Sequence, residues 1–252
     1  MKRDRIEEIA LLIDKRGKVT LAQLEKRFPG VSQMTLRRDL LTLEENGRII
    51  RIRGGAMSVK DVQKASGVPY AQKTNLNTDE KRTIAEKAAA LIDEGASIFI
   101  DGGTTALYFA KELPDIECNI FTNGIAVAQE LAKKKNVNIH LLGGQLQKDN
   151  LSTVSSLAPM HFQDVNFELA IISATAFTPE NGFSCNTIMG AELLKLIREK
   201  AKFLYMMLDS SKIGKIMPYT FARAQDINVL ITDVNFPQKL KEEFQNMDIV
   251  VI

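Results

Sequence analysis

The sequence of 252 residues has few of the residues and segments that mark several classes of protein. Its only cysteines are Cys118 and Cys185, so the disulfide framework of a small secreted domain is excluded. Its two histidines, His140 and His161, have no partner at metal-ligand spacing, and we interpret both as structural. No uninterrupted apolar run reaches the roughly 18 residues of a membrane-spanning helix. We therefore expect a cytoplasmic protein with reduced thiols, no membrane partner, and no metal or other cofactor.

Positive charge is concentrated at one end of the chain. Residues 1–60 contain 14 lysines and arginines against 8 acidic residues, a net charge of +6, whereas the other 192 residues have a net charge of −4. A basic head on an acidic body favours a head that meets a polyanion. A lysine-rich solvated surface is the alternative, and charge alone does not separate the two.

Three short helices are predicted in the first 50 residues. Apolar residues recur at helical spacing over 6–13, 21–28 and 36–43. Thr20 stands three residues before Gln23, which is the capping-box pattern that begins a helix. Three short helices joined by tight turns are typical of a helix-turn-helix domain.

The third of these helices has the polar outer face of a DNA-recognition helix. Ser32 can cap its first turn, and its leucines turn inward. Arginine can make a bidentate contact to guanine and glutamine to adenine, while short hydroxyl side chains suit phosphate contacts. An isolated arginine pair is more often solvated, but the capped helix and the basic strand that follows favour DNA contacts. We expect these contacts from Ser32, Gln33, Met34, Thr35, Arg37 and Arg38.

A basic β-ribbon follows the three helices. Arg51 and Arg53 alternate with isoleucines, which is strand periodicity, and Gly54-Gly55 supplies a turn. Both arginines can lie along the DNA backbone or enter the minor groove. Asp39 is expected to orient Arg38 or a neighbouring residue, because a carboxylate faces phosphate unfavourably. Residues 1–58 are therefore predicted to form a winged helix-turn-helix.

The rest of the chain is predicted to be a larger α/β domain. Residues 59–80 are polar and weakly patterned, and we interpret them as a linker. From residue 81 to residue 252, helical and strand patterns alternate, as in a mostly parallel sheet covered on both faces.

Three turns of this domain have the composition of a ligand site. Each follows a predicted strand, and parallel strands in an open α/β sheet bind ligands at their carboxyl ends. Glycines let the backbone approach a ligand, and the free N–H groups at the start of a helix attract anions. The pattern matches neither a Walker A loop nor a GxGxxG loop. The residues are Asp101, Gly102, Gly103, Thr104 and Thr105, then Thr122 and Asn123, then Gly143 and Gly144.

The head resembles the N-terminal domain of the DeoR family of bacterial transcriptional regulators. The similarity covers residues 3–57. It is carried by Val31-Ser32, Thr35-Leu36-Arg37-Arg38-Asp39-Leu40, Leu43, Gly47 and Arg53-Gly54-Gly55-Ala56.

The second half resembles the sensor domain of the same family. The resemblance implies a fold related to ribose-5-phosphate isomerase, a phosphorylated sugar as effector, and Lys212 as a cation for its phosphate. The matching residues are Lys81, Ile84-Ala85, Asp101, Gly103-Thr104-Thr105, Thr122-Asn123, Gly143-Gly144, Gly182, Glu192, Asp209-Ser210-Ser211-Lys212, Gly214 and Thr232-Asp233.

Several positions depart from the family pattern. Lys73 stands where an arginine is common, and Glu168 where an aspartate is usual. Ser155 and Ser173 stand near positions where glycine is usual, and Leu194 where lysine is usual. These departures leave open a different ligand or a weakened site.

The sequence therefore predicts a transcriptional regulator, a repressor of a sugar-metabolism operon relieved by a phosphorylated sugar. Its partners are a double-stranded DNA operator and a small phosphorylated metabolite. Because operators have twofold symmetry, we expect a homodimer or homotetramer assembled through residues 81–252. A sugar-phosphate isomerase-like enzyme with a basic appendage, and a DNA-binding regulator with a non-functional sensor, remain the alternatives.

Overall fold

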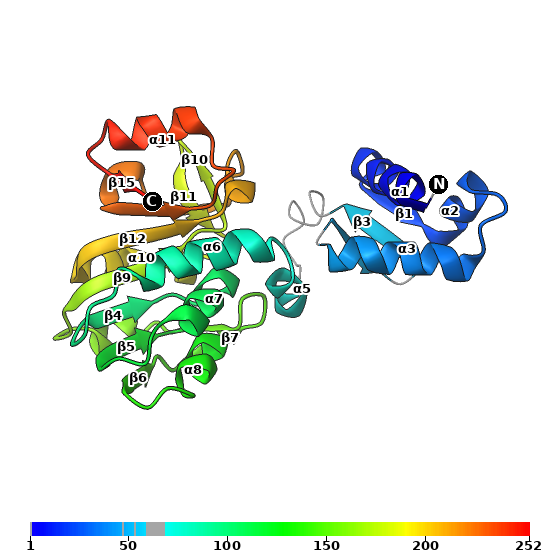
Figure 1. Ribbon diagram of the computed structural model, residues 1–252. Coiled ribbons are helices and arrows are strands. Elements are labelled where there is room, and N and C mark those ends of the chain that lie inside the picture. Colours follow the sequence, from blue (N-terminus) through cyan, green and yellow to red (C-terminus); the bar gives the residue numbers. More distant parts are fainter. Residues whose placement is uncertain (1, 47, 53, 59–68) are drawn as a thin grey trace. The chain divides into compact units, whose positions relative to one another are not determined.

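The computed structural model describes residues 2–46, 48–52, 54–58 and 69–252. The chain divides into two compact units, Met1–Leu76 and Asn77–Ile252. Each unit has its own elements and is described by itself (Figure 1).

The first unit contains the predicted winged helix-turn-helix. Its elements are α1 (Lys2–Arg16), β1 (Lys18–Thr20), α2 (Leu21–Arg27), α3 (Gln33–Glu45), β2 (Ile49–Ile52) and β3 (Gly55–Ser58). The strands form an antiparallel sheet in the order β1-β3-β2, and the short strand β1 was not predicted. Ile9, Ile13, Leu24, Leu36 and Leu43 are buried in a core that joins the three helices.

The two predicted helix starts are confirmed in atomic detail. The Thr20 side chain accepts a hydrogen bond from the backbone N–H of Gln23, and the Gln23 side chain accepts one from the backbone N–H of Thr20. Ser32 caps α3 by accepting a hydrogen bond from the backbone N–H of Thr35.

Part of the segment interpreted as a linker is helical. Helix α5 (Tyr70–Thr74) and the first turn of α6 (Thr78–Ala89) fall inside residues 69–80. Between them, Asn77 adopts a left-handed conformation with φ of 51°. The other residues of this segment, 59–68, lie outside the described residues.

The second unit contains a seven-stranded sheet in the order β15-β14-β12-β9-β4-β5-β6. All of its neighbouring strands pair in parallel. The strands are β4 (Ser97–Ile100), β5 (Cys118–Thr122), β6 (Val137–Leu141), β9 (Phe167–Ser173), β12 (Ala201–Leu208), β14 (Val229–Thr232) and β15 (Val250–Val251).

Helices cover both faces of this sheet. Helices α6, α7 (Thr104–Glu112) and α8 (Ile125–Leu131) lie on the face nearer the viewer in Figure 1, and they pack on Ile98 and Ile100 of β4. Helices α9 (Ala158–His161), α10 (Ile188–Lys200) and α11 (Gln238–Gln245) contribute to a second core around Phe99, which lies between Ile98 and Ile100 on β4. Because adjacent strand residues point to opposite faces, the alternation of Ile98, Phe99 and Ile100 confirms burial on both sides.

The shorter elements follow the carboxyl ends of the parallel strands. A hairpin of β7 (Gln145–Gln147) and β8 (Ser152–Val154) follows β6. Strands β10 (Ala176–Thr178) and β11 (Gly182–Cys185) follow β9 and pair with β13 (Tyr219–Ala222) in a small antiparallel sheet. A short 3-10 turn, η1 (Ser210–Lys212), follows β12, and a second, η2 (Ala224–Asp226), follows β13.

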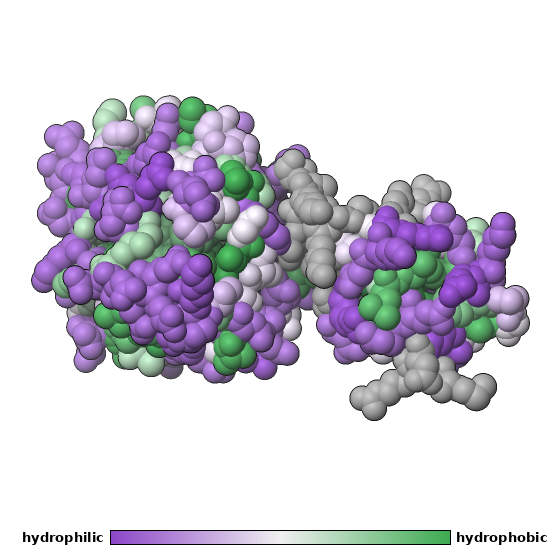
Figure 2. Space-filling model, turned by 90° about the horizontal axis from the view of Figure 1, so that it is seen from above, coloured by the Kyte–Doolittle hydropathy of each residue, from purple (hydrophilic) through white to green (hydrophobic). Residues whose placement is uncertain are grey.

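Polar residues cover most of the molecular face that Figure 2 displays, and apolar residues on it are scattered. In the described residues, no helix combines the length and hydropathy that crossing a membrane would need.

Candidate DNA interface and sensor site

Helix α3 has one apolar face, which is buried, and one charged face, which is exposed. Leu36 and Leu40 are buried in the core, whereas Met34 is 73% exposed and the arginines at 37 and 38 are exposed. Gln33 is exposed on the same outward side. In the part of the chain that the structure describes, the guanidinium groups of Arg37 and Arg38 have no hydrogen-bond or ion-pair partner. Both are therefore available to an anionic partner.

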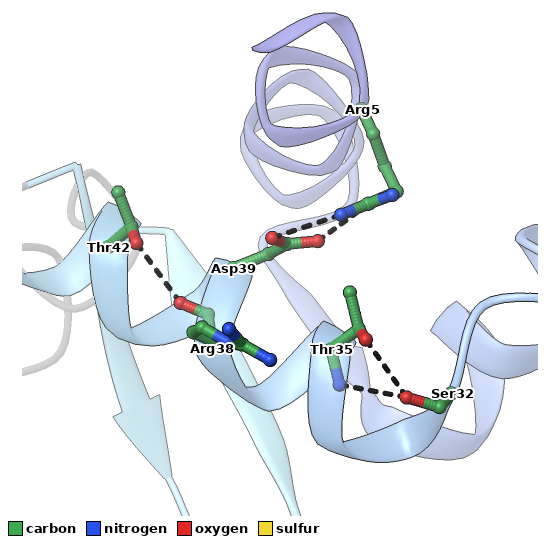
Figure 3. A network of polar contacts seen from close by, with 6 residues as sticks. All are labelled: Arg5, Ser32, Thr35, Arg38, Asp39 and Thr42. Carbon is green, nitrogen blue, oxygen red and sulfur yellow. Dashed lines mark hydrogen bonds and ion pairs between the residues drawn. The ribbon is translucent and has the colours of Figure 1, made fainter. Parts of the chain in front are cut away.

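The cap of α3 brings two of the predicted contact residues together. The Ser32 hydroxyl lies 3.2 Å from the backbone nitrogen of Thr35 and 2.9 Å from the Thr35 hydroxyl. Figure 3 shows both hydroxyls at the start of the helix. Since a hydroxyl group is one donor and two acceptors, this pair keeps hydrogen-bonding capacity for a phosphate oxygen.

Arg51 of the wing is bound to the end of α3. Its Nε lies 2.5 Å from Oε2 of Glu44, and its backbone N–H donates to Oε1 of the same carboxylate at 3.0 Å. The arginine remains exposed, so a phosphate can approach it only in competition with Glu44 or beside it. Arg53, the other predicted wing contact, lies outside the described residues.

Asp39 binds a residue that the sequence did not indicate. We expected it to orient Arg38 or a neighbour, but its carboxylate is turned toward α1, where Arg5 donates two hydrogen bonds of 2.7 and 3.2 Å. Asp39 is only 1% exposed. Its hydrogen bond and charge raise the pKa of Arg5 against the opposing effect of burial.

The loop after β4 lies at the switch point of the sheet, where the chain stops adding strands on one side of β4 and begins to add them on the other side. The chain runs from β4 to β5 and β6 on one side, then returns to β9 on the other side of β4. In open α/β sheets, ligands bind in the crevice beyond the carboxyl ends of the strands at such a point. Residues 101–105 follow β4 there, and Ser173 ends β9 next to them.

Asp101 is buried at this switch point. Burial raises its pKa to about 7, although hydrogen bonds with the Gly102 backbone, the Asn123 side chain and the Ser173 backbone lower it. A carboxyl group that is part protonated near neutrality can both accept and donate a hydrogen bond. It therefore suits a neutral hydroxyl group better than an anion.

Replacing Asp101 with asparagine is expected to stabilise the fold at pH 8 and not at pH 4. The folded pKa of about 7 lies above the unfolded value of about 3.9, so stability from this group is complete below the unfolded pKa and is lost as pH rises through 7. The difference between variant and wild type should grow to a few kcal/mol, at about 1.4 kcal/mol per pKa unit. Urea unfolding at pH 4, 6 and 8 measures it, with the exposed Asp93→Asn as control. A difference that stays constant over this range would contradict the assignment.

Thr122 and Asn123 stabilise the turns of the site through buried hydrogen bonds. The Thr122 hydroxyl is fully buried and accepts a hydrogen bond from the backbone N–H of Gly124 at 3.0 Å. The Asn123 side chain accepts one from the backbone N–H of Gly102 at 2.8 Å and donates one to the carbonyl of Thr153 at 3.3 Å. Asn123 thereby holds the turn after β4, the turn after β5 and strand β8 together, and Thr122 fixes the turn after β5.

Gly102 allows the hairpin to pack against the turn. A Cβ at this position would lie 2.5 Å from the Cβ of Ser152 and 3.3 Å from the Cα of Gly124. Gly144 has a similar role. Its φ is 142°, and a Cβ at this position would lie only 2.3 Å from the carbonyl oxygen of Val154. Gly143, in contrast, is exposed and faces open space.

The variant Gly102→Ala is expected to lose about 1–3 kcal/mol of stability, which is typical of an overpacked core. The added methyl group meets the Ser152 side chain, so Ser152→Gly in the same chain should restore part of the loss. Gly143→Ala, which adds a methyl group in open space, is the matched control. Thermal unfolding measures all three, and an unchanged melting temperature for Gly102→Ala would contradict this packing.

The start of α7 lies at the carboxyl end of β4. Gly103 is its N-cap residue with φ of 125°, and no described side chain caps the helix. Gly103 and Thr104 are half-buried and reachable, whereas Thr105 is buried. Ser173, one of the departures from the family pattern, lies 3.6 Å from the place that a Cβ on Gly103 would take.

Lys212 lies in a turn that follows another strand of the sheet, β12. It is half-buried in η1, which follows β12, and β9 separates β12 from β4. The segment is held by Asp209, whose carboxylate accepts from the backbone N–H of Ser211 at 3.1 Å. Asn77, at the start of the second unit, donates to the Ser211 hydroxyl at 2.8 Å.

The structure adds residues that sequence reasoning missed. Thr187 caps α10, and its hydroxyl lies 3.1 Å from Nε2 of Gln147 in the hairpin. Burial raises the pKa of Cys185 to about 11. In the sequence, Thr187 could have been recognised only as a possible N-cap residue of the helix that follows it, three residues before Gly190. Leu194, one of the departures from the family pattern, is buried in the hydrophobic core.

The comparisons with known proteins agree with this architecture. Residues 5–62 match the DeoR-like helix-turn-helix domain, and residues 76–234 match the DeoR C terminal sensor domain. The chain is 34% identical to the uncharacterized HTH-type transcriptional regulator YulB of Bacillus subtilis, over 91% of this chain and 88% of that protein. It is 32% identical to the lactose phosphotransferase system repressor of Streptococcus mutans, over 99% of each chain.

Two further comparisons describe a full-length relative and a solved structure. The HTH-type transcriptional regulator GolR of Listeria innocua is 31% identical, over 98% of this chain and 97% of that protein. Ribose 5-phosphate isomerase A of Methanocaldococcus jannaschii superposes with a TM-score of 0.41 and 16% identity, over 55% of this chain and 56% of that chain.

A winged helix-turn-helix joined to an α/β domain with glycine- and threonine-containing turns at its switch point is the architecture of a DNA-binding transcriptional regulator. The matches to both domains and to full-length relatives are specific to one group of these regulators. The chain belongs to the DeoR family.

Proposed function

We propose that this regulator is a repressor of a sugar-metabolism operon and that a phosphorylated sugar relieves the repression. The observation that supports it most is the outward face of α3, where Arg37 and Arg38 stand unpaired beside Gln33 and Met34 among the described residues. A recognition helix reads base edges with residues at this end. The name of the Streptococcus mutans relative, a repressor of the lactose phosphotransferase system, supports the repressor role.

The effector is proposed to bind beyond the carboxyl ends of β4, β9 and β12. Its phosphate lies at the start of α7, where the backbone N–H groups and the helix dipole favour an anion. Asp101 binds a sugar hydroxyl, and Lys212, which follows β12, supplies a cation for the phosphate. Asn123 and Gly144 act on the effector through the shape of the site, because they contact the turn after β4 and strand β8. Thr122 shapes its own turn by accepting from Gly124, and Gly143 is exposed.

The domains divide this work. Residues 1–58 bind double-stranded DNA, and residues 81–252 sense the effector and assemble a homodimer or homotetramer, since twofold operators call for twofold proteins. The role is binding and not turnover, in keeping with relatives that are named transcriptional regulators. Sedimentation equilibrium of the full chain bound to operator DNA tests the assembly. A protein that binds as a monomer at micromolar concentration would contradict it.

Two experiments test the proposal. Selection from a pool of random duplexes should recover one preferred sequence, which then serves as the operator; recovery of no preferred sequence contradicts DNA reading. A thermal-shift panel of hexose and pentose phosphates should contain a stabilising compound, since a ligand at about 100 times its dissociation constant adds about 2.7 kcal/mol. If none stabilises the chain, the sensor reads another ligand or none. Consumption of a panel compound would favour the isomerase-like alternative.

A further inference from the structure

We propose that Arg5 and Asp39 are positioning residues, and that their ion pair sets the rotation of the recognition helix and so the place at which Arg37 and Arg38 meet DNA. This inference rests on the proposed reading of DNA by α3. It assigns a role to two residues of opposite charge that lie 34 positions apart in the sequence.

The geometry of the pair is that of a fixed connection between two helices. Both oxygens of Asp39 accept hydrogen bonds from different nitrogens of the same guanidinium group, at 2.7 and 3.2 Å. The Asp39 side chain is 1% exposed and that of Arg5 is 21% exposed. A bidentate arginine–carboxylate contact constrains orientation as well as distance.

The position of Asp39 on α3 makes it suited to control rotation. It directly follows Arg38, and successive residues of an α-helix differ in direction by about 100°. The pair therefore holds one side of the helix while the arginines leave on another, as Figure 3 shows for Arg38. A rotation of about 20° would move a guanidinium group roughly 3 Å, given an arm of about 9 Å from the helix axis. Such a shift is enough to break a bidentate base contact.

The remaining contacts of α3 with the core control its rotation less strictly. Leu36, Leu40 and Leu43 pack through non-directional apolar contacts. Among the described residues, α3 makes one other ion pair, Glu44 with Arg51, which lies near its end and is largely exposed, with side chains 34% and 44% accessible. Exposed pairs of this kind contribute little.

The test separates helix placement from simple stability. Arg5→Lys keeps the charge and loses the planar fork, and Arg5→Met with Asp39→Leu replaces the pair with apolar side chains, an exchange that often preserves stability. Arg27→Lys is the matched control, because Arg27 makes an ion pair of 2.8 Å with Glu8 on α1 that does not involve α3. Each full-length variant is measured for its melting temperature, its dissociation constant for the selected operator, and its dissociation constant and salt slope for a random duplex of the same length.

The expected result is a selective loss. Arg5→Lys and the double variant should bind the operator at least tenfold more weakly than wild type, with random-duplex affinity within twofold and an unchanged salt slope, since the number of phosphate contacts is the same. Arg27→Lys should match wild type in every measurement. Equal weakening toward both duplexes, a lowered melting temperature without loss of preference, or wild-type preference in the double variant would overturn the inference. If wild type itself prefers no sequence, the proposed function is wrong and this inference with it.

Discussion

Replacing both Arg37 and Arg38 with alanine is expected to remove the preference of the chain for its operator. Each bidentate base contact is worth about 1–3 kcal/mol, or roughly 5- to 150-fold in affinity. The two residues are neighbours, so their effects need not add, but the double variant should bind the operator and a random duplex with similar dissociation constants. Both side chains are exposed and unpaired among the described residues, so the fold should be unaffected. Fluorescence anisotropy with the two labelled duplexes measures this change.

The control for the double variant is Arg16→Ala. Arg16 is exposed in the last turn of α1, outside the recognition helix, so its loss lowers positive charge without removing a base contact. It should weaken binding to both duplexes alike and flatten the salt dependence by at most about one unit. Operator preference that survives in the Arg37, Arg38 double variant would show that another element reads the sequence.

Lys212→Met is expected to weaken the binding of a sugar phosphate by about ten- to a hundredfold. The substitution keeps much of the apolar stem and removes the ammonium group, and a charge-assisted hydrogen bond is worth about 1.5–3 kcal/mol. Isothermal titration with the stabilising compound of the panel measures the change. Lys239→Met, on the exposed face of α11, is the control and should bind as wild type does. Undiminished affinity in Lys212→Met would place the phosphate elsewhere.

Local signals in the sequence were sufficient for most of the fold. The capping box at Thr20 and the cap at Ser32 were predicted because the groups that interact are three residues apart. The parallel sheet with helices on both faces followed from alternating strand and helix patterns. The short strand β1 and helix α5 were missed, since three and five residues are too few to establish a period.

The candidate sites were predicted less completely, because their contacts join distant residues. Asp39 was recognised as unlike its neighbours, but Arg5 could not be named as its partner across 34 positions. The sequence placed Thr122 and Asn123 in the sensor turns without revealing that both are buried, and that Asn123 is bonded to the turn after β4. The pairing of Arg51 with Glu44 likewise depends on how the wing folds back to α3.

The most direct test of the account is release of DNA by the effector. Labelled operator duplex, half-saturated with the full chain, is titrated with the sugar phosphate that stabilises the protein, and anisotropy is followed. The account predicts a fall to the value of free DNA in wild type, with the midpoint shifted about ten- to a hundredfold higher in Lys212→Met. An anisotropy that no phosphorylated sugar in the panel changes would contradict the account.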